Sequence, residues 1–528
     1  MLGSLWSRLV GQRLTQSNAA LDQDLLVQVR AAHSANDLRE VLRRQAKLPD
    51  FVALKLPSLL SELNALFWPA LEVEKVLAYV DFFSGANAQG YHRVLKNSLV
   101  RRDYALFMTA CVHCYLADRF AEGAALLDMF QPHEDPSTNW AEYLAYAGYI
   151  NFAAGKPVNL ALKCFDQALE AGYFSPLLAV NAYPIYFETG RLVHCQKLRA
   201  LIQKNCPDDP EAIYALASVE LARNYYAEGF RLMEARYRIP DLARFINISL
   251  LQKPRLDRQS LSDKRLLVHG EQGLGDMIMM ARYLPLLREQ GFELMIDGRA
   301  EACSLLLHNF PYCKFLVSDI QSPIAEPFDY WTGIMSLPYH FNTTALSVPS
   351  VEGYLSVPME QTTYWRQRVL GLASGAKLRV GLTWSGNPGH RADKRRSMSF
   401  ELMCSFVQRH PSIHFFSLQT HVPAGHPVNM IDIADELLTM ADTAAVIAEM
   451  DLVISVDTSA IHLAGALGRP AWLLLPHRYE WRWGLEGEAN AWYSSVRVWR
   501  QKQFGAWPAV LDRVEIALKS FKNAKARG

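Results

Sequence analysis

The stretch that decides the fold is Asp451-Leu-Val-Ile-Ser-Val-Asp457-Thr-Ser-Ala-Ile-His462-Leu-Ala-Gly-Ala-Leu-Gly468-Arg-Pro470. Its apolar run, Leu452–Val456, predicts a buried strand. The residues after it predict a helix that Asp457 or Thr458 caps and that Gly468 terminates. A buried strand followed at once by a helix is the building unit of α/β domains with a parallel sheet.

Similar units lie on both sides of this stretch, from residue 262 onward. Amphipathic helices, among them Met277–Gln290 and Phe400–Arg409, separate the short apolar runs, and a last helix, Ala506–Ser520, is expected to pack back across the domains. This alternation predicts two Rossmann-like domains, at residues 262–370 and 378–525, that face one another across a cleft at the carboxyl ends of their strands. The predicted strands are Arg265–His269, Glu293–Ile296, Lys314–Val317, Arg379–Thr383, His414–Leu418, Leu452–Val456 and Trp472–Leu475.

Residues 98–240 show an internal period. Turn-forming residues recur at Asp118, Gly155, Gly190 and Asn224, at intervals of 37, 35 and 34 residues. This is the period of tetratricopeptide repeats, in which paired antiparallel helices stack into a superhelix. Residues 1–97 are predicted to form a separate helical region. The expected fold class is therefore α + α/β, with helical repeats preceding two Rossmann-like domains.

Small residues at fixed offsets from these turns support the repeats, because closely packed helices need them. The residues about five positions after each turn are Gly123, Ala161, Cys195 and Gly229, and those seven positions before each turn are Cys111, Gly148, Tyr183 and Ala217. Only Tyr183 is large. The pattern predicts that both cysteines in these sets are packing residues.

The composition is that of a cytoplasmic globular protein. The net charge is +1, from 54 basic and 53 acidic residues, so no excess of charge indicates binding to nucleic acid. No apolar run approaches the ~20 residues that span a bilayer, and Met1–Asn18 does not resemble a secretory signal. The chain is thus expected in the cytoplasm, or peripheral to the inner membrane. The eight cysteines include one C-x-x-C pair, Cys111 and Cys114, without a second pair for zinc, and are expected to be reduced.

The first predicted ligand loop, His269–Asp276, follows a strand and opens a helix. Its Gly273 and Gly275 allow the backbone to approach a ligand closely. Asp276 is either a general base for an acceptor hydroxyl or an ordinary helix cap. A dinucleotide fingerprint would need glycine three residues after Gly275, where Ile278 stands, so an oxidoreductase of that kind is excluded.

The second predicted loop follows the strand Arg379–Thr383. Ser385, Gly386 and Asn387 offer hydroxyl, amide and backbone donors, and a basic cluster follows that includes Lys394 and Arg396. Such a cluster either neutralises a diphosphate leaving group or is a solvated surface.

The third loop lies in the opening stretch. Asp457, Thr458 and Ser459 begin a helix whose amides suit a phosphate or a ribose, and His462 lies one turn further on the same face. The alternative is that His462 is a packed core residue. No G-x-S-x-G elbow is present, which argues against serine hydrolase chemistry.

Taken together, these motifs resemble the tetratricopeptide-repeat glycosyltransferases related to glycosyltransferase family 9, which includes the ADP-heptose:lipopolysaccharide heptosyltransferases. The resemblance covers about residues 100–520. It is carried by Gly270-Glu-Gln-Gly-Leu-Gly-Asp276 with Ala281-Arg-Tyr-Leu-Pro285, by Val380–Pro388, by Asp451–Pro470, and by Phe416-Ser-Leu-Gln419 and Trp492-Tyr493.

The resemblance implies a GT-B fold and an inverting, metal-independent transfer that needs no cofactor besides the nucleotide-sugar substrate. Asp276 matches the acid proposed as catalytic base. Asp457, Thr458, Ser459 and His462 match the donor loop, and Lys394 falls where heptosyltransferases place a donor-contacting lysine. Here Arg395-Arg396-Ser397 replaces the aromatic residue that follows that lysine in the family.

The sequence thus predicts a glycosyltransferase of the hexosyl or heptosyl type. The predicted donor-binding residues are Gly273, Gly275, Ser385, Gly386, Asn387, Lys394, Arg396, Gln419, Asp457, Thr458, Ser459 and His462, with Asp276 catalytic. The repeats indicate a polypeptide acceptor; a lipopolysaccharide or lipid-linked acceptor is the alternative. A different function, a non-catalytic repeat scaffold that retains the fold, stays open.

Overall fold

A computed structural model describes residues 107–525, apart from residues 109–110, 113, 116–118, 130–139, 173, 240–241, 243–245, 248–249, 251, 258–262, 318–323, 374–377, 388–392, 478–479 and 504. The predicted helical region 1–97 and the turn at Asp118 lie outside the described residues. The chain divides between Ala182 and Tyr183 into two compact units, each treated by itself below.

The unit that ends at Ala182 is helical. It contains α8 (Phe120–Met129), α9 (Trp140–Ala153), α10 (Val158–Glu170) and the start of α11 (Pro176–Glu188). Helices α9 and α10 form a hairpin that turns at Gly155, whose φ is 79°. A side chain at Gly148 would collide with the ring of Phe165, so glycine is what lets the two helices approach. This hairpin turns where the sequence predicted it.

The second unit begins with the remaining helices of this kind. They are α12 (Leu192–Asn205), α13 (Pro210–Ala222), α14 (Tyr226–Met233) and the 3₁₀ helix η2 (Glu234–Arg238). The left-handed turns at Gly190 and Asn224 have φ of 71° and 64°. A Cβ at Gly229 would lie 2.6 Å from Leu221 Cγ, so close packing of α14 on α13 requires the glycine. The predicted turns are confirmed, and the tetratricopeptide assignment stays a prediction.

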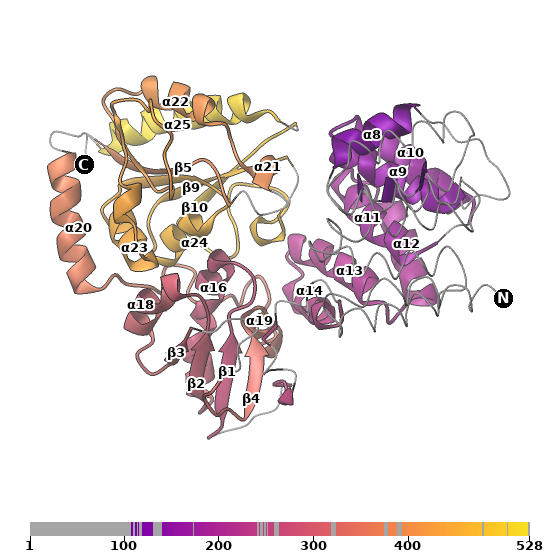
Figure 1. The fold of residues 1–528 in the computed structure, drawn as a ribbon, viewed down its shortest axis with the longest axis horizontal. Helices are drawn as coiled ribbons and strands as arrows, with labels where there is room; N and C mark the ends of the chain where they lie inside the picture. Colours follow the sequence, from indigo (N-terminus) through magenta and orange to yellow (C-terminus); the bar gives the residue numbers. More distant parts are fainter. Residues whose placement is uncertain are drawn as a thin grey trace, which may run out of the picture. The chain divides into compact units, whose positions relative to one another are not determined.

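The first α/β domain is built on a four-stranded parallel sheet in the order β3-β2-β1-β4 (Figure 1). Its strands are β1 (Arg265–His269), β2 (Glu293–Asp297), β3 (Lys314–Leu316) and β4 (Tyr330–Gly333). Its helices are α16 (Leu274–Met280), η4 (Ala281–Tyr283), α17 (Leu284–Glu289), α18 (Ala300–Asn309), η5 (Ile334–Ser336) and α19 (Leu337–His340). Three of the four strands, and their parallel pairing, were predicted.

The predicted helix Met277–Gln290 is interrupted. Helix α16 ends at Met280, η4 follows, and α17 carries Pro285 in its first turn. Proline has no N–H to donate to the preceding turn, so it is favoured at a helix start and not in an interior. The break at Pro285 therefore divides one expected helix into two.

The second α/β domain has a six-stranded parallel sheet in the order β10-β9-β8-β5-β6-β7. Its strands are β5 (Arg379–Thr383), β6 (His414–Ser417), β7 (Met430–Ile431), β8 (Leu452–Val456), β9 (Ala471–Leu475) and β10 (Val496–Arg500). Its helices are α20 (Met359–Leu372), α21 (Asp393–Arg396), α22 (Phe400–Gln408), η6 (Ala434–Glu436), α23 (Met440–Ala448), α24 (Ser459–Ala466), η7 (Trp481–Trp483) and α25 (Trp507–Lys525). Every residue of β8 and β9 is buried.

Helices cover both faces of this sheet, with α22 and α25 on one face and α23 and α24 on the other (Figure 1). The core on the first face joins Val380, Ile454 and Trp472 of the strands to Phe406 of α22 and Val510 of α25. We expected the last helix to cross between the domains, and in the described residues it packs on the second sheet.

Helix α20 belongs by its packing to the second domain, although the sequence suggested a domain boundary at residue 370. The indole N–H of Trp365 donates to Asp442 Oδ1 at 3.1 Å, and Arg368 pairs with Glu436 at 2.8 Å. Trp365 is fully buried.

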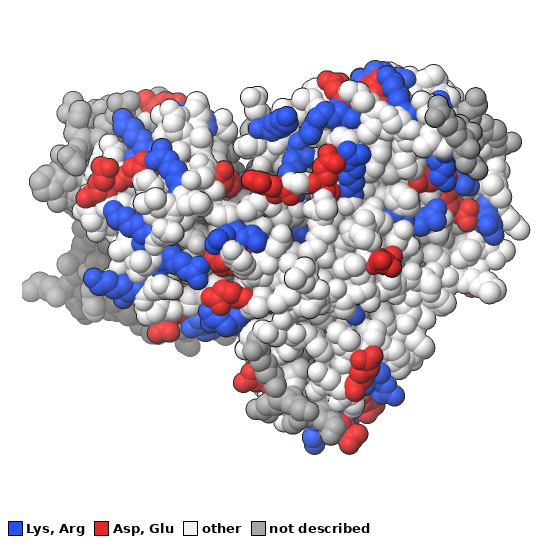
Figure 2. Space-filling view, turned by 180° about the vertical axis from the view of Figure 1, so that it is seen from behind, with Lys and Arg blue, Asp and Glu red and all other residues white. Residues whose placement is uncertain are grey.

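On the face shown in Figure 2, basic and acidic side chains are interspersed. Among the described residues, no helix is both long enough and apolar enough to cross a membrane. All eight cysteines are free thiols, four of them buried.

Candidate functional site

The loop after β1 is fixed to the neighbouring strand. Gly270 N donates to Asp297 O at 2.6 Å, and His269 Nδ1 lies 2.7 Å from Asp297 Oδ2. A Cβ at Gly270 would collide with Met277 and lie 2.7 Å from the Asp297 carbonyl oxygen. The glycine thus permits the close approach of two strand ends, which sets where α16 begins.

Asp276 has partners on both carboxylate oxygens. Its Oδ2 accepts from Gly273 N at 3.2 Å, which makes it part of the N-terminal cap of α16. Its Oδ1 accepts from Arg482, with Nε at 2.8 Å and Nη2 as a second donor. From the sequence, Asp276 was either a helix cap or a general base. In the structure its carboxylate caps α16 and also pairs with a charged side chain, Arg482.

Arg482 lies in η7 of the second domain and was not predicted. Its side chain is 13% exposed and also contacts Glu480. Burial lowers the pKa of Arg482, but Asp276, Glu480 and Asp457 outweigh it and hold the pKa above its ordinary value. In the sequence, Arg482 stands between Trp481 and Trp483, both of which are buried in the structure. A single arginine between two tryptophans is the pattern that could have indicated it.

The first and third loops meet through Gly275 and His462. A Cβ at Gly275 would lie 2.7 Å from His462 Cδ2, so α16 packs on α24 with no room for a side chain. His462 is 3% exposed, and its Nδ1 lies 3.1 Å from Tyr493 Oη. Its Nε2 lies 3.7 Å from Asp457 Oδ1. His462 is a packed residue that also faces a carboxylate.

The start of α24 has no side-chain cap. Thr458 occupies the cap position but makes no capping bond, and its Oγ1 lies 3.2 Å from Ser455 Oγ. The predicted side-chain cap by Asp457 or Thr458 is therefore not formed. Ile461 N donates to Thr458 O at 3.2 Å, and the amides of Ser459 and Ala460 precede this first bond of the helix.

Asp457 is charged at neutral pH. Burial raises its pKa, but the hydrogen bond and charge of His462, together with Arg482 and Arg396, lower it below its ordinary value. Arg396 also donates from Nη1 to the backbone oxygen of Asp457 at 2.8 Å, which joins the second loop to the third.

The second loop is held by Gln419, at the end of β6. Gln419 Oε1 accepts from Trp384 N at 2.9 Å and Ser385 N at 3.0 Å, and its Nε2 donates to Ser385 Oγ at 3.0 Å. Gly386 N donates to Ser397 Oγ at 3.0 Å. Gln419 thus supports the turn of the second loop, and its predicted place in donor binding stays a prediction.

The remaining predicted residues of this loop differ in their positions. A side chain at Gly386 would collide with Arg396 and lie 2.5 Å from Asp393 Oδ1. Asn387 is exposed. Lys394 lies in α21, and its side chain is outside the described residues. Of the two predicted cations, Arg396 lies beside the third loop, and its role in donor binding stays a prediction.

Arg282, a second unpredicted arginine, joins the two domains. It is 1% exposed and donates to the backbone oxygens of Trp492 at 2.7 Å and Pro349 at 3.2 Å. Its guanidinium lies over the rings of Tyr354 and Tyr493, at 4.6 and 4.8 Å from their centroids. Arg282 therefore connects the two domains close to His462, which contacts Tyr493.

Arg236, in η2, ties the segment that follows helices α12–α14 to the first loop. It is buried and donates to both carboxylate oxygens of Glu271, at 2.9 and 2.6 Å, and to Ser336 Oγ at 2.8 Å. Burial lowers its pKa, but Glu271 and its other partners raise the pKa well above its ordinary value. The loop that carries Asp276 is therefore anchored by η2.

Three loops at the carboxyl ends of parallel strands thus converge, as predicted. Together they present a carboxylate at Asp276, guanidinium groups at Arg396 and Arg482, and the uncapped start of α24. Cations and helix-start amides suit an anionic ligand such as a phosphate.

Comparison with known proteins shows that part of this site is similar to a family. Residues 423–492 match the profile of glycosyltransferase family 9 (heptosyltransferase). Protein FlbA of Caulobacter vibrioides is 28% identical over 60% of this chain and 56% of its own length, so the chain spans about half of that relative.

Solved structures with similarity include a family 9 glycosyl transferase from Veillonella parvula (13% identity, TM-score 0.33) and the ADP-heptose LPS heptosyltransferase II of E. coli (14%, 0.35). Each covers 50% of this chain and 99% of its own. A mutant O-GlcNAc transferase of Thermobaculum terrenum (12%, 0.27) covers 82% and 92%. The profile match, which includes Asp457, His462 and Arg482, confirms the resemblance of this chain to glycosyltransferase family 9.

Proposed function

We propose that residues 262–525 form a GT-B glycosyltransferase that moves a sugar from a nucleotide-sugar donor to an acceptor hydroxyl. The observation that carries this proposal is the convergence of Asp276, Arg482 and the uncapped start of α24, inside and beside the segment that matches family 9. The site has a base for the hydroxyl and positive groups for a diphosphate, which are the two requirements of glycosyl transfer.

In the proposed reaction, the Asp276 carboxylate takes the proton of the acceptor hydroxyl. The acceptor oxygen forms a bond to the anomeric carbon from the face opposite the diphosphate, and the bond from that carbon to the diphosphate oxygen breaks with its electron pair. The configuration inverts in this single displacement. The amides at the start of α24 and the guanidinium of Arg396 stabilise the departing nucleoside diphosphate.

Arg482 has a double role in this proposal. Without ligand it neutralises Asp276, which lies beside it in a largely buried position. When a donor binds, its diphosphate competes with Asp276 for the guanidinium, because both are anions. Donor binding then releases the carboxylate for the acceptor and supplies the leaving group with a cation in place of a metal ion.

We further propose that the acceptor is a polypeptide bound by the helical repeats. The support is that η2, which follows the last of these helices, is bonded through Arg236 and Glu271 to the loop that carries the proposed base. Glycolipid acceptors remain the competing class for this site, and the donor is a hexose or heptose nucleotide.

A second candidate function, a repeat scaffold without catalysis, has one observation in its favour. Both oxygens of Asp276 are engaged in structural contacts, a cap and an ion pair between domains. In this alternative Asp276 joins the domains and removes no proton.

The deciding experiment has two stages. Thermal stabilisation is measured first with UDP-, ADP-, GDP- and CMP-sugars. Stabilisation by one donor class supports the enzyme, and its absence with all donors at millimolar concentration supports the scaffold. Intact-mass analysis of a candidate acceptor after coexpression then gives the mass added, which identifies the sugar. A responsive donor with no mass added to polypeptide or glycolipid contradicts transfer.

A further inference from the structure

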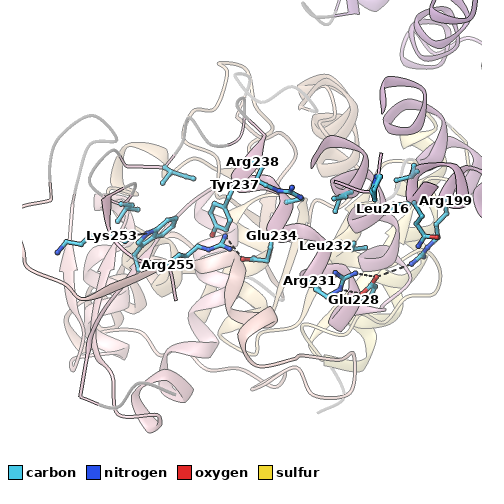
Figure 3. Close-up of a pocket in the computed structure, with 18 residues that line it drawn as sticks. Arg199, Leu216, Glu228, Arg231, Leu232, Glu234, Tyr237, Arg238, Lys253 and Arg255 are labelled. Atoms are coloured by element: carbon cyan, nitrogen blue, oxygen red, sulfur yellow. Dashed lines mark hydrogen bonds and ion pairs between the residues drawn. The ribbon is translucent and has the colours of Figure 1, made fainter. Parts of the chain in front are cut away.

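A cavity of about 660 Å³, lined by no residue of the three ligand loops, lies where helices α12–α14 meet the first α/β domain (Figure 3). Helices α12, α13 and α14 and η2 form one side. The other side is formed by Ile246, Leu250, Lys253 and Arg255, and by Trp331 of β4. The reaction proposed above uses none of these side chains, so the cavity needs an explanation of its own.

The floor of the cavity is apolar. Leu216 and Leu232 from the helices face Leu250 and Trp331 from the first domain. All four are less than a tenth exposed, and the indole N–H of Trp331 is satisfied by Lys253 O at 3.1 Å. A ligand that rests on this floor therefore needs apolar groups of its own.

The rim of the cavity is cationic. Five basic side chains line it, against two carboxylates, Glu228 and Glu234. The basic residues are Arg199, Arg231, Arg238, Lys253 and Arg255.

The two carboxylates are already shared among several cations. Glu228 pairs with Arg231 at 2.7 Å and Arg199 at 3.7 Å. Glu234 pairs with Arg255 at 3.3 Å and also with Arg236 behind the wall. Arg199 is also paired with Glu220, which lies outside the lining, at 2.5 Å. The rim cations that these carboxylates leave without an ion pair among the described residues are Arg238 and Lys253.

Two of the rim cations have no carboxylate partner among the described residues. Arg238 donates to a backbone oxygen, that of Asp208, at 3.1 Å. Lys253 lies over the ring of Phe328, 5.6 Å from its centroid. Both cations are available to pair with an anionic ligand, so charge complementarity favours a ligand with acidic groups.

The cations are spread along the cavity and are not gathered at one point. In Figure 3, Arg199 and Arg231 lie at one end, Lys253 and Arg255 at the other, and Arg238 between them. A single phosphate would engage one end only. An extended peptide rises about 3.3 Å per residue and offers carboxylates at intervals, with apolar side chains directed to the other face.

We propose that this cavity is a docking site for an extended, acidic segment of the acceptor polypeptide, with apolar side chains on its floor. The proposal rests on the polypeptide acceptor proposed above. Docking is coupled to the site because Glu234 and Tyr237 line the cavity, while Arg236 between them holds Glu271 in the loop of Asp276.

The test measures binding directly, without a donor. A short fluorescent peptide in which Asp and Leu alternate is titrated with the full chain, and its anisotropy is followed. In the variant Arg238→Glu with Lys253→Glu, two attractions become repulsions, and the affinity is expected to fall about tenfold or more.

The matched control is Lys519→Glu with Lys522→Glu in α25, which changes the net charge equally. It is expected to bind the peptide as the unchanged chain does. Equal affinity of the cavity variant and the control overturns the proposal. So does equal binding of a peptide in which Lys replaces Asp.

A lipid source of the same chemistry is tested with vesicles of phosphatidylglycerol. If the vesicles bind and the cavity variant abolishes that binding while peptide binding is unchanged, the polypeptide proposal is overturned. If the proposed glycosyltransferase function is wrong, no nucleotide-sugar stabilises the chain. Peptide binding to the cavity can still be measured in that case, so the two proposals are tested separately.

Discussion

The carboxylate of Asp276 and the guanidinium of Arg482 form an ion pair that joins the two α/β domains. Asp276 lies in the first turn of α16, and Arg482 lies in η7, after the central strands of the second sheet. The proposed base is therefore held by the domain that is proposed to bind the donor. This makes the donor a competitor for Arg482 and connects binding to catalysis.

Asp276→Asn is expected to lower transfer by at least about 10²-fold, the contribution of a positioned general base. The amide keeps an oxygen for the cap bond from Gly273, so the fold and nucleotide binding are expected to persist. Initial rates and thermal stabilisation by the donor measure the two effects. The control is Glu301→Gln in the first turn of α18, an exposed acid. Unchanged turnover in Asp276→Asn would remove its catalytic role.

Arg482→Lys is expected to raise KM for the donor, because a lysine keeps the charge but cannot make a forked contact to the diphosphate. Arg482→Gln loses the charge as well and is expected to weaken donor binding further. Its melting temperature is also expected to fall, since the carboxylates of Asp276 and Glu480 lose their partner. The measurement is a donor titration for both variants. A donor affinity equal in all three proteins would contradict contact between Arg482 and the diphosphate.

Gly275→Ala is expected to destabilise the contact between α16 and α24 by about 1–3 kcal/mol, the range for an overpacked core. Its Cβ would lie 2.7 Å from His462, which is fixed by Tyr493. The matched control is Gly371→Ala in α20, where no atom lies within 4 Å of the added Cβ. That change is expected to stabilise by about 0.5–1 kcal/mol, since alanine favours helix. Equal melting temperatures for the two variants would show that the contact is unimportant.

The sequence predicted the central strands of both sheets because their runs of branched residues are buried on both faces. Leu452–Val456 and Arg379–Thr383 were placed to the residue. The edge strands β4, β7 and β10 were missed. Tyr330–Gly333 and Met430–Ile431 are short, and Val496–Arg500 alternates with exposed Arg497, so none forms a continuous apolar run.

The candidate site was predicted wherever a motif follows a strand directly. Asp276, Asp457 and His462 lie together as expected. Arg482, Arg282 and Arg236 were missed because each acts through a contact between segments far apart in the sequence. Arg482 and its carboxylate partner Asp276 are 206 residues apart in the sequence, and a local sequence pattern cannot show that they are in contact.

The buried His410 is expected to make stability depend on pH. Burial lowers its pKa below the ordinary value of 6.5; Glu515 opposes this, whereas Arg409, Lys519 and Lys522 add to it. The unfolded chain then binds the proton more readily, so stability is full above pH 6.5 and is lost as the pH falls through the lower folded pKa.

His410→Gln is expected to flatten the fall in melting temperature between pH 7 and pH 5, because glutamine does not titrate in this range. His421→Gln, at an exposed position, serves as the control and should follow the unchanged chain. Parallel curves for all three proteins would contradict the assignment to His410.

The pair formed by Arg236 and Glu271 is expected to be the most sensitive point between the repeats and the first domain. Both side chains are less than a tenth exposed. Arg236→Met leaves the Glu271 carboxylate buried without its main partner, which costs about 3–5 kcal/mol for a pair of this kind. Glu271→Met leaves the guanidinium in the same position. The expected result is a large fall in the melting temperature of each single variant.

The double variant Arg236→Met with Glu271→Met removes both charges and is expected to be more stable than either single variant, because no buried ion is left unpaired. Hydrogen exchange at residues 270–276 gives a local readout, and faster exchange is expected in the single variants only. Arg238→Met, two residues away and bonded to a backbone oxygen, is the control. Losses that add in the double variant would show that the two residues act independently, and the repeats would then not be anchored to the loop of Asp276 through this pair.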